Sequence, residues 1–204
     1  AGLSTAAIAA LSTDQIASLS SSLIAGLSPN QIAVLSTDQA EALTPTQVRA
    51  LSAKQIAAFG ADDIATFSTD DIAAINTKSM SGLTSAAFAE LTPGQLAALT
   101  TAQISGLLPA QVAGMGDDFF AGLTTAQIAA LNPTVIGGLT PDQIEAMTTA
   151  QVEALTSLQV KALTSTQLAA LEPADLATFS TADIAANTAR AACSARLGCT
   201  TSRS

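Results

Sequence analysis

The chain has 204 residues, of which 49% are apolar, but it contains no Trp, Tyr or His and carries a formal net charge of −9. This acidic excess argues against binding to nucleic acid, which depends on basic side chains that neutralise phosphates, and against binding to an anionic membrane surface. No apolar run approaches the roughly 20 residues that a membrane-spanning helix requires, so we expect no membrane insertion.

From residue 3 to residue 186 the chain repeats one pattern of eight residues, 23 times in a single register. Each octad opens with an apolar residue, as at Leu3 and Leu11, and a second apolar residue follows five positions later, as at Ile8 and Ile16. An unbroken short period of this extent indicates a tandem-repeat architecture rather than one or two ordinary globular domains.

The polar residues between the two apolar series predict a helix start in every octad. The residue after the leading apolar one is Ser, Thr or Asn in 19 of the 23 octads, and three residues later Gln or Asp stands in 17 of them. Ser or Thr followed after three residues by Gln is the pattern of a capping box, in which two side chains satisfy free backbone N–H groups at a helix start. All seven prolines directly follow the cap position and all eleven aspartates lie within three residues after it, as expected for the first turn of a helix.

Two other architectures fit the sequence less well than short capped helices. In one continuous helix, eight residues overshoot two turns by roughly 80°, so the apolar series would spiral around the helix, and each interior proline would cost roughly 3 kcal/mol. A β-solenoid would favour β-branched or aromatic residues in alternation, whereas Ile-Ala-Ala-Leu after Gln favours a helix. We therefore predict an all-α fold, an α-solenoid or superhelix of about 23 short capped helices with one helix per octad.

A single octad is too short to fold alone, so the octads must stack. Its buried Leu and Ile do not offset the backbone entropy that the octad loses on folding. The residue before each leading apolar residue is mostly Ala or Gly, whereas the position before that accepts Glu41, Arg49 and Lys161. We expect the small residue to face a neighbouring helix and the more variable position to face water.

The chain divides into an octapeptide-repeat region over residues 3–186 and an irregular C-terminal tail over residues 187–204. The tail contains both cysteines, Cys193 and Cys199. They form either a local disulfide in an oxidising compartment or two free thiols, and a zinc site is disfavoured because two thiols without His leave the tetrahedral shell half empty. Since the chain begins at Ala1 rather than Met, we expect a processed product or a segment of a longer protein.

Four aspartates form two acidic pairs eight residues apart, Asp62 with Asp63 and Asp70 with Asp71. Stacked octads would bring these pairs onto adjacent helix starts, and carboxylate oxygens are ligands that Ca²⁺ takes. The four residues are therefore a candidate Ca²⁺ site. The alternative, which we prefer, is that they only interact favourably with the positive ends of the helix dipoles.

We call the position three residues after the cap, where Gln or Asp usually stands, the box position, and its occupant the box residue. In the stretch GDDFFAGL the cap residue is Gly116 and the box residue is Phe119. It predicts an exposed aromatic where Gln normally stands, which marks either a partner contact or a bend, although local repacking is the preferred interpretation. Catalysis has few candidate residues, because the chain has no His, no Tyr, no thiol within the octads and no glycine-rich phosphate loop. We therefore expect no enzymatic activity and no cofactor.

The octads LTTAQIAA from Leu123 and LTPDQIEA from Leu139 resemble the short LTxxQI repeats that occur in tandem in very large bacterial secreted and surface-associated proteins. The resemblance covers nearly all of residues 3–186 and implies an extended extracellular or cell-surface segment, such as a stalk or a fibre component. The stretch LTPDQIEAM also resembles the opening of a TAL effector repeat. The period of eight, the missing base-reading loop and the acidic surface depart from that family, so this second resemblance implies no DNA-binding function.

Together these observations predict a structural protein, an extracellular or cell-surface rod that acts as a spacer or as a filament subunit. Its expected partners are further copies stacked end to end, or the continuation of a longer repeat array. Ser and Thr at solvent-facing helix starts are candidate positions for O-linked glycans. The alternative function is an adhesin-like binding module, in which the irregular octads around residues 60–72 and 108–122 hold a protein, a glycan or Ca²⁺.

Overall fold

The computed structural model describes residues 3–185 and residue 187, and over these residues the fold is all-helical. It contains twenty-one α-helices and one 3-10 helix, without a strand in the described part. Cys193 and Cys199 of the predicted tail lie outside the described residues. None of the described helices has the length and apolar character that crossing a bilayer requires. The prediction of an all-helical repeat fold is confirmed.

The helices are four to six residues long, and their first residues follow one another at intervals of eight. A further helical stretch covers residues 181–185. The bounds are α1 (Thr5–Ala9), α2 (Thr13–Ser18), α3 (Ser21–Ala25), α4 (Pro29–Ile32), α5 (Thr37–Glu41), α6 (Pro45–Ala50), α7 (Ala53–Ile56), α8 (Ala61–Ala65), α9 (Thr69–Ala74), η1 (Thr77–Gly82), α10 (Ser85–Ala89), α11 (Pro93–Ala98), α12 (Thr101–Ser105), α13 (Pro109–Val112), α14 (Asp117–Ala121), α15 (Thr125–Ala130), α16 (Pro133–Ile136), α17 (Pro141–Glu145), α18 (Thr149–Glu153), α19 (Ser157–Ala162), α20 (Ser165–Ala170) and α21 (Pro173–Leu176).

Each helix starts and ends through interactions within its own octad and with the first residue of the next octad, as α2 illustrates. The backbone N–H of Gln15 donates to the Ser12 hydroxyl at 3.2 Å, and the N–H of Ser12 donates to Gln15 Oε1 at 2.8 Å. At the other end Leu19 donates its N–H to the carbonyl of Ile16 at 3.1 Å, and its extended backbone (ψ 141°) leads the chain out of the helix. Local chemistry thus stops every helix after a turn or two and redirects the chain.

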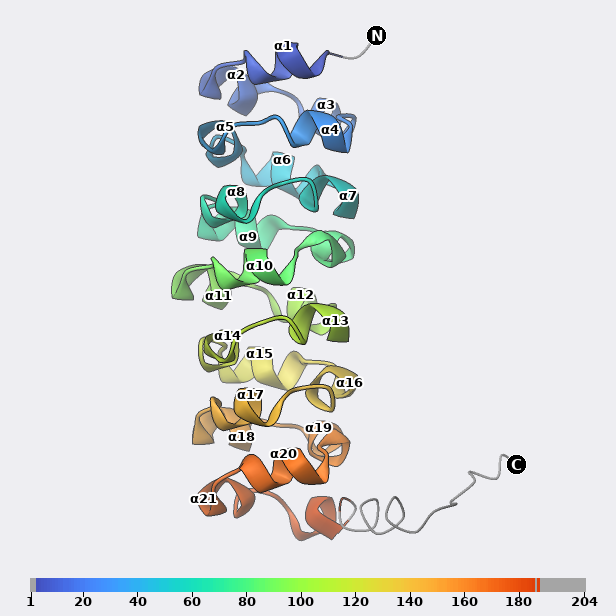
Figure 1. Cartoon of the computed structure of the whole chain (residues 1–204), viewed down its shortest axis with the longest axis vertical. Coiled ribbons are helices and arrows are strands. Elements are labelled where there is room, and N and C mark those ends of the chain that lie inside the picture. The colour runs from blue at the N-terminus through green and yellow to red at the C-terminus, as the bar shows by residue number, and fades with distance from the viewer. Residues whose placement is uncertain (1–2, 186, 188–204) are drawn as a thin grey trace, which may run out of the picture.

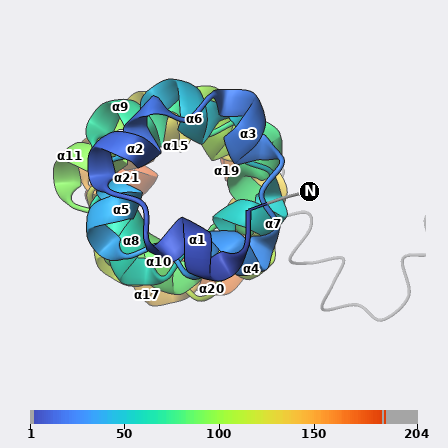
Figure 2. The ribbon, with the colours of Figure 1, turned by 90° about the horizontal axis from the view of Figure 1, so that it is seen from above.

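The two apolar series form one continuous core. Residues of the second series, such as Ile8, Ile16 and Ile24, are completely buried, and the cluster of buried residues extends to Leu171. Figure 2 shows the helices arranged as a ring around the long axis of the molecule. The core therefore runs along the molecule instead of filling a sphere.

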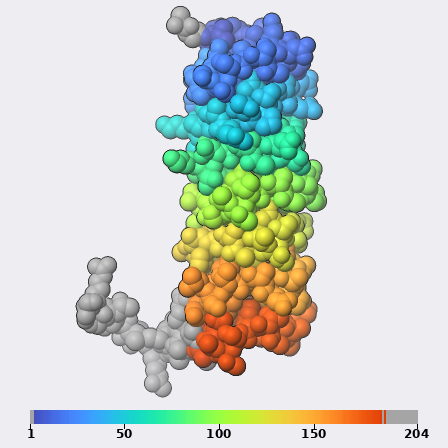
Figure 3. Space-filling view, turned by 180° about the vertical axis from the view of Figure 1, so that it is seen from behind, coloured from blue at the N-terminus to red at the C-terminus, as the bar shows by residue number. Residues whose placement is uncertain are grey.

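Helices three octads apart in the sequence pack against one another. Examples are α3 on α6, α6 on α9 and α16 on α19. Figure 1 shows the helices as layers of a tall column with the N-terminus at one end, and Figure 3 shows the sequence as successive coloured bands along it. Each stretch of chain therefore contacts only stretches that are near in sequence, as expected for a repeat architecture.

The box glutamines connect each layer to the layer before it. Gln103 Oε1 accepts from the N–H of Thr100 at 2.7 Å and from its hydroxyl at 3.0 Å, while Nε2 donates to the carbonyls of Ile72 and Ile75, both at 2.8 Å. The amide thereby makes all four hydrogen bonds that it can form. Other glutamines with two such inter-layer bonds are Gln39, Gln47, Gln55, Gln95, Gln111, Gln127, Gln143, Gln151, Gln159 and Gln167.

The spacing of these bonds fixes how far the chain travels before it lies against itself. The two acceptor carbonyls of Gln103 belong to residues 31 and 28 positions earlier. The chain therefore returns to the same side of the column after between three and four octads. Beyond the last described octad, Asn187 donates from Nδ2 to the carbonyl of Val160 at 2.6 Å, an equivalent contact across layers.

The 3-10 helix η1 shows how the layers adapt when the box residue is not Gln. Ser79 donates its hydroxyl to the carbonyl of Leu51 at 2.7 Å, again 28 residues earlier. Serine reaches less far than glutamine, so the layers come closer here. A Cβ at Gly82 would lie 2.1 Å from the carbonyl oxygen of Ala53, so only glycine fits at this position. The small residue therefore faces a neighbouring layer, as predicted.

The more variable position behaves as expected from its composition. Glu41, Arg49 and Lys161 are all exposed. Charged side chains are tolerated there because their polar ends remain in water. The two neighbouring positions of the octad are thus distinguished by contact with the adjacent layer.

We predict that Gln103→Glu destabilises the fold by about 2–5 kcal/mol, because it removes two donors and leaves a buried charge against two carbonyl oxygens. Gln15→Glu is the matched control. Gln15 is exposed and its described hydrogen bonds are confined to its own octad, so its capping box survives and the expected change is below about 0.5 kcal/mol. Urea unfolding followed by far-ultraviolet circular dichroism measures both variants, and equal shifts of their midpoints would contradict the assignment.

Candidate functional site

A pocket of about 430 Å³ lies beside Phe119, between α10, α11 and α14. Its walls include Phe88, Leu91, Leu96 and Phe119, and Asp118 is the one titratable residue among the residues that line it. Pockets of this size with mainly apolar walls and a few polar groups are typical of small-ligand sites. The pocket is therefore the candidate binding site of the described chain.

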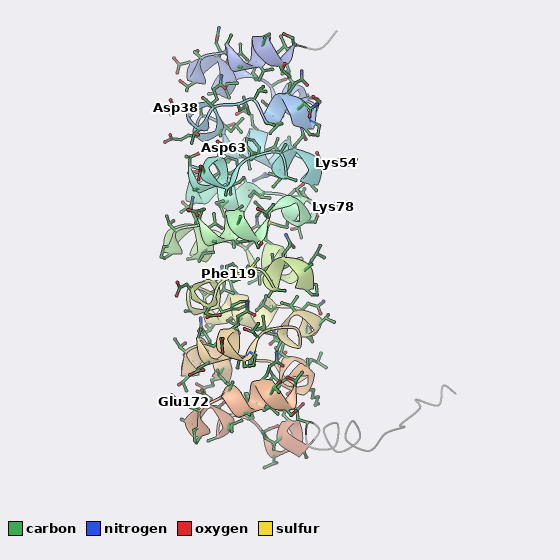
Figure 4. All side chains as sticks on the ribbon, viewed as in Figure 1. Asp38, Lys54, Asp63, Lys78, Phe119 and Glu172 are labelled. Atoms are coloured by element: carbon green, nitrogen blue, oxygen red, sulfur yellow. The ribbon has the colours of Figure 1, made fainter. Side chains whose placement is uncertain are left out.

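Phe119 itself is buried, with 4% of its surface exposed. Its ring packs edge to face on Phe88, with ring centroids 5.5 Å apart, and on Phe120 at 5.2 Å. The expectation of an exposed aromatic is therefore wrong, and the preferred interpretation as local repacking holds. The physical reason is that the box position faces the preceding layer, so a phenyl ring there packs against the apolar core, within the column in Figure 4.

The pocket lies where the glutamine bonds between layers are interrupted. A glutamine at position 119 would donate to carbonyls 31 and 28 residues earlier, which are those of Phe88 and Leu91. Phe119 has no donor to offer them. A second pocket, of about 490 Å³, is lined by Pro133, Thr134 and Gly137, next to Val135, which also stands at a box position. The pocket beside Phe119 thus lies at a missing glutamine bond, whereas the second pocket borders Ala162 and Thr164 of a later octad.

The four aspartates of the predicted Ca²⁺ site are placed separately at the starts of α8 and α9. Asp63 Oδ2 accepts from the N–H of Gly60 at 3.0 Å, and Asp71 Oδ2 accepts from the N–H of Ser68 at 3.0 Å. Asp62 and Asp70 are exposed. Over residues 3–185 and 187, no three or more His, Cys, Asp or Glu side chains form a group that could hold a metal ion. The structure therefore does not gather these four carboxylates into one site.

Asp71 has a feature that its sequence neighbours lack. It is 4% exposed, and its Oδ1 is buried without a hydrogen-bond partner. With the spacing that the glutamines follow, a Gln at position 71 would donate to the carbonyls of Ala40 and Leu43. A carboxylate can only accept hydrogen bonds, so Asp71 leaves one link between layers unmade.

The capping pattern alone predicts the box residue as part of a helix start and not as a link between layers, although the sequence contains a signal for that second role. A capping box accepts Glu as readily as Gln, and a carboxylate at a helix start would gain from the dipole. Nevertheless Gln stands at 13 of the 23 box positions and Glu at none. Only a requirement for N–H donors distinguishes the two residues.

Four stretches of the chain match the family model described as the ALTTAQ repeat, namely residues 1–29, 24–53, 64–101 and 136–172, which together cover more than half of its length. No curated protein matches the sequence. The unmatched stretch between residues 102 and 135 contains Leu108, Gly116 and Phe119, three departures from the octad pattern. The chain is accordingly a tandem repeat protein, and its candidate pocket lies beside its least regular octads.

We predict that Asp71→Gln raises the free energy of unfolding by about 1–3 kcal/mol, because it supplies the missing donors and removes an unpartnered buried oxygen. Asp70→Gln, on the exposed neighbour, should instead lower it by about 0.3–1 kcal/mol through loss of a favourable interaction with the helix dipole. Urea unfolding curves distinguish the two signs. A loss of stability in Asp71→Gln would show that the register does not place carbonyls at this side chain.

Proposed function

Because the chain belongs to the ALTTAQ repeat family, we propose that it is a structural protein, an α-solenoid of capped octapeptide helices that serves as an extracellular or cell-surface rod. It acts as a spacer or as a filament subunit and performs no catalysis. The observation that carries this proposal is the series of inter-layer glutamine bonds, which repeats with the same spacing from Gln39 to Gln167. The same pair of hydrogen bonds connects one layer to the next along the column. The number of octads therefore sets the length of the rod.

The solenoid assignment is supported by the spacing of contacts. Helices three octads apart pack together, and glutamine amides bond to carbonyls 28 and 31 residues earlier. Contacts restricted to near neighbours distinguish a solenoid from a compact domain, in which distant segments meet. A continuous winding of octads around one axis accounts for all of these contacts.

The proposed filament grows by end-to-end association of columns, with the same glutamine bonds between copies that connect the layers within one chain. Gln15 lies in the first layer, and its exposed amide is at the position that in later layers donates to a preceding layer. A preceding layer, supplied by a longer array or by a second copy of the chain, would provide the carbonyls. Head-to-tail contacts of this kind continue into a filament unless they close into a ring.

The proposed surface location rests on the resemblance of the octads to repeats of bacterial secreted and surface-associated proteins. The hydroxyls that directly follow the caps are exposed at Thr13, Thr37 and Thr101, among others. These hydroxyls are the proposed positions for O-linked glycans.

A second candidate function is a binding module, and the pocket beside Phe119 favours it. Its walls are mainly apolar, Asp118 is among the residues that line it, and the carbonyl of Leu91 has no glutamine partner. An apolar group that carries an N–H donor or a positive charge would match these features. In this alternative the regular octads are the scaffold that presents the pocket.

Deletion of whole octads tests the rod. Removal of residues 83–146, which are eight octads, keeps every later box residue in register, so we expect a shorter rod that still unfolds cooperatively. Removal of residues 83–142 displaces the later octads by half a repeat and should abolish the helical signal of the C-terminal part. Small-angle scattering and circular dichroism measure both, and equal behaviour of the two deletions would refute the solenoid.

Labelling of intact source cells tests the location. An antibody against the purified chain should label unbroken cells or material outside them, because a spacer or fibre works beyond the membrane. Labelling that appears only after the cells are lysed would contradict the surface role. An antibody against a cytoplasmic protein provides the control for cell integrity.

A further inference from the structure

Asp175 stands at a box position in α21, where most octads have Gln. It is 6% exposed, and its Oδ1 is buried without a hydrogen-bond partner. In the glutamine-containing layers this side chain donates to carbonyls 31 and 28 residues earlier, which for Asp175 are those of Ile144 and Met147. α21 packs against α18, and Figure 1 shows both helices, together with α17, in the part of the column that leads to its C-terminal end. A carboxylate oxygen thus takes the place of an amide NH₂ group, and acceptors face acceptors.

Asp183 also replaces Gln at a box position, but there a positive charge compensates the carboxylate. Lys161 Nζ lies 3.8 Å from Asp183 Oδ1, and the Ser157 hydroxyl donates to Oδ2 at 3.2 Å. Lys161 stands 22 residues before Asp183. The residue 22 positions before Asp175 is Glu153, which is exposed. The repeat therefore places an acid at Asp175 where it places an ammonium group at Asp183.

The spacing of the repeat makes acidic side chains and backbone carbonyls the expected neighbours of Asp175. Glu153 belongs to α18, which packs against α21. Glu172, the cap residue of α21, is exposed, makes no side-chain cap bond and lies along one edge of the column, opposite Lys54 and Lys78, in Figure 4. Ile144 lies in the last turn of α17 and Met147 two residues beyond its end, so both carbonyls are near the negative end of the helix dipole. All of these groups favour a cation.

The exchange of Gln for Asp also creates the space that a cation needs. The aspartate side chain is shorter by one carbon–carbon bond, about 1.5 Å. A carboxylate oxygen at the box position is therefore farther from the two carbonyls than an amide nitrogen would be. Calcium bridges oxygen ligands at about 2.3–2.6 Å from each.

We propose that the chain binds one Ca²⁺ ion between the layers at Asp175. The protein ligands are Asp175 Oδ1 and the carbonyl oxygens of Ile144 and Met147, with water completing the shell, and Glu153 and Glu172 add negative charge nearby. One carboxylate with carbonyls and water gives a weak site, with a dissociation constant of about 10⁻⁴–10⁻³ M. Mg²⁺ binds less well, because it demands a tighter octahedral shell and keeps its water. This site is distinct from the aspartates of α8 and α9 and does not depend on the proposed structural role.

Thermal unfolding with CaCl₂ or MgCl₂ at equal concentration, up to about 10 mM, tests the site in the full chain. Asp175→Gln removes the carboxylate and restores the amide donors, so this variant is expected to fold. Asp142→Asn, at an exposed aspartate of α17, is the matched control for general screening of the acidic charge. Far-ultraviolet circular dichroism is the readout, since the chain has no Trp or Tyr.

The expected result is a rise of the melting temperature in Ca²⁺ over Mg²⁺ for the wild type and for Asp142→Asn, and none for Asp175→Gln. Calorimetric titration should show one Ca²⁺ site in the first two proteins and a loss of binding by at least tenfold in the third. Equal responses of all three proteins, or no difference between the two cations in the wild type, would overturn the proposal. Those outcomes leave the rod untouched, because the octad deletions test it separately.

Discussion

The fold depends on one type of interaction, which is made by the side-chain amide of each box glutamine buried between two layers of the column. A buried amide is tolerated only when its donors and acceptor are satisfied, and the box glutamine meets this condition by accepting from its own helix start and donating to two carbonyls of the preceding layer. The same group therefore starts a helix and positions it on the layer below. An octad without this link would be a helix of about one turn, well below the length at which isolated helices persist in water.

Box positions without glutamine show how the hydrogen bond between layers affects the packing of the layers. Serine at position 79 keeps the bond to the preceding layer by bringing the layers together, and the glycine at position 82 accommodates the closer approach. Phe119 replaces the bonds with ring packing and borders a pocket. Aspartate loses the donors, which leaves one buried carboxylate oxygen without a partner at Asp71 and one at Asp175. Asp71 keeps the bond to its helix start, whereas α21 starts without a side-chain cap bond. Regular octads thus build the column, and substituted octads are where its inter-layer bonds are interrupted.

The helical fold and the position of every helix were predictable from the sequence because their causes lie within one octad. Cap residues, prolines and first-turn aspartates define the helix start, and the apolar series define the buried residues. The number of octads per turn was not predictable, because it depends on how closely the layers approach. The burial of Phe119 was missed for a related reason, since the box position was assigned to a helix start alone. The absence of Glu from the box positions would have revealed the contact between layers.

Hydrogen exchange of the glutamine side-chain amides, followed by nuclear magnetic resonance, tests the central role of these groups most directly. The account predicts slow exchange of both Nε2 protons of Gln103, which is 1% exposed and donates to two carbonyls, and fast exchange for the exposed Gln15. Equally fast exchange of the two side chains in the folded protein would contradict it.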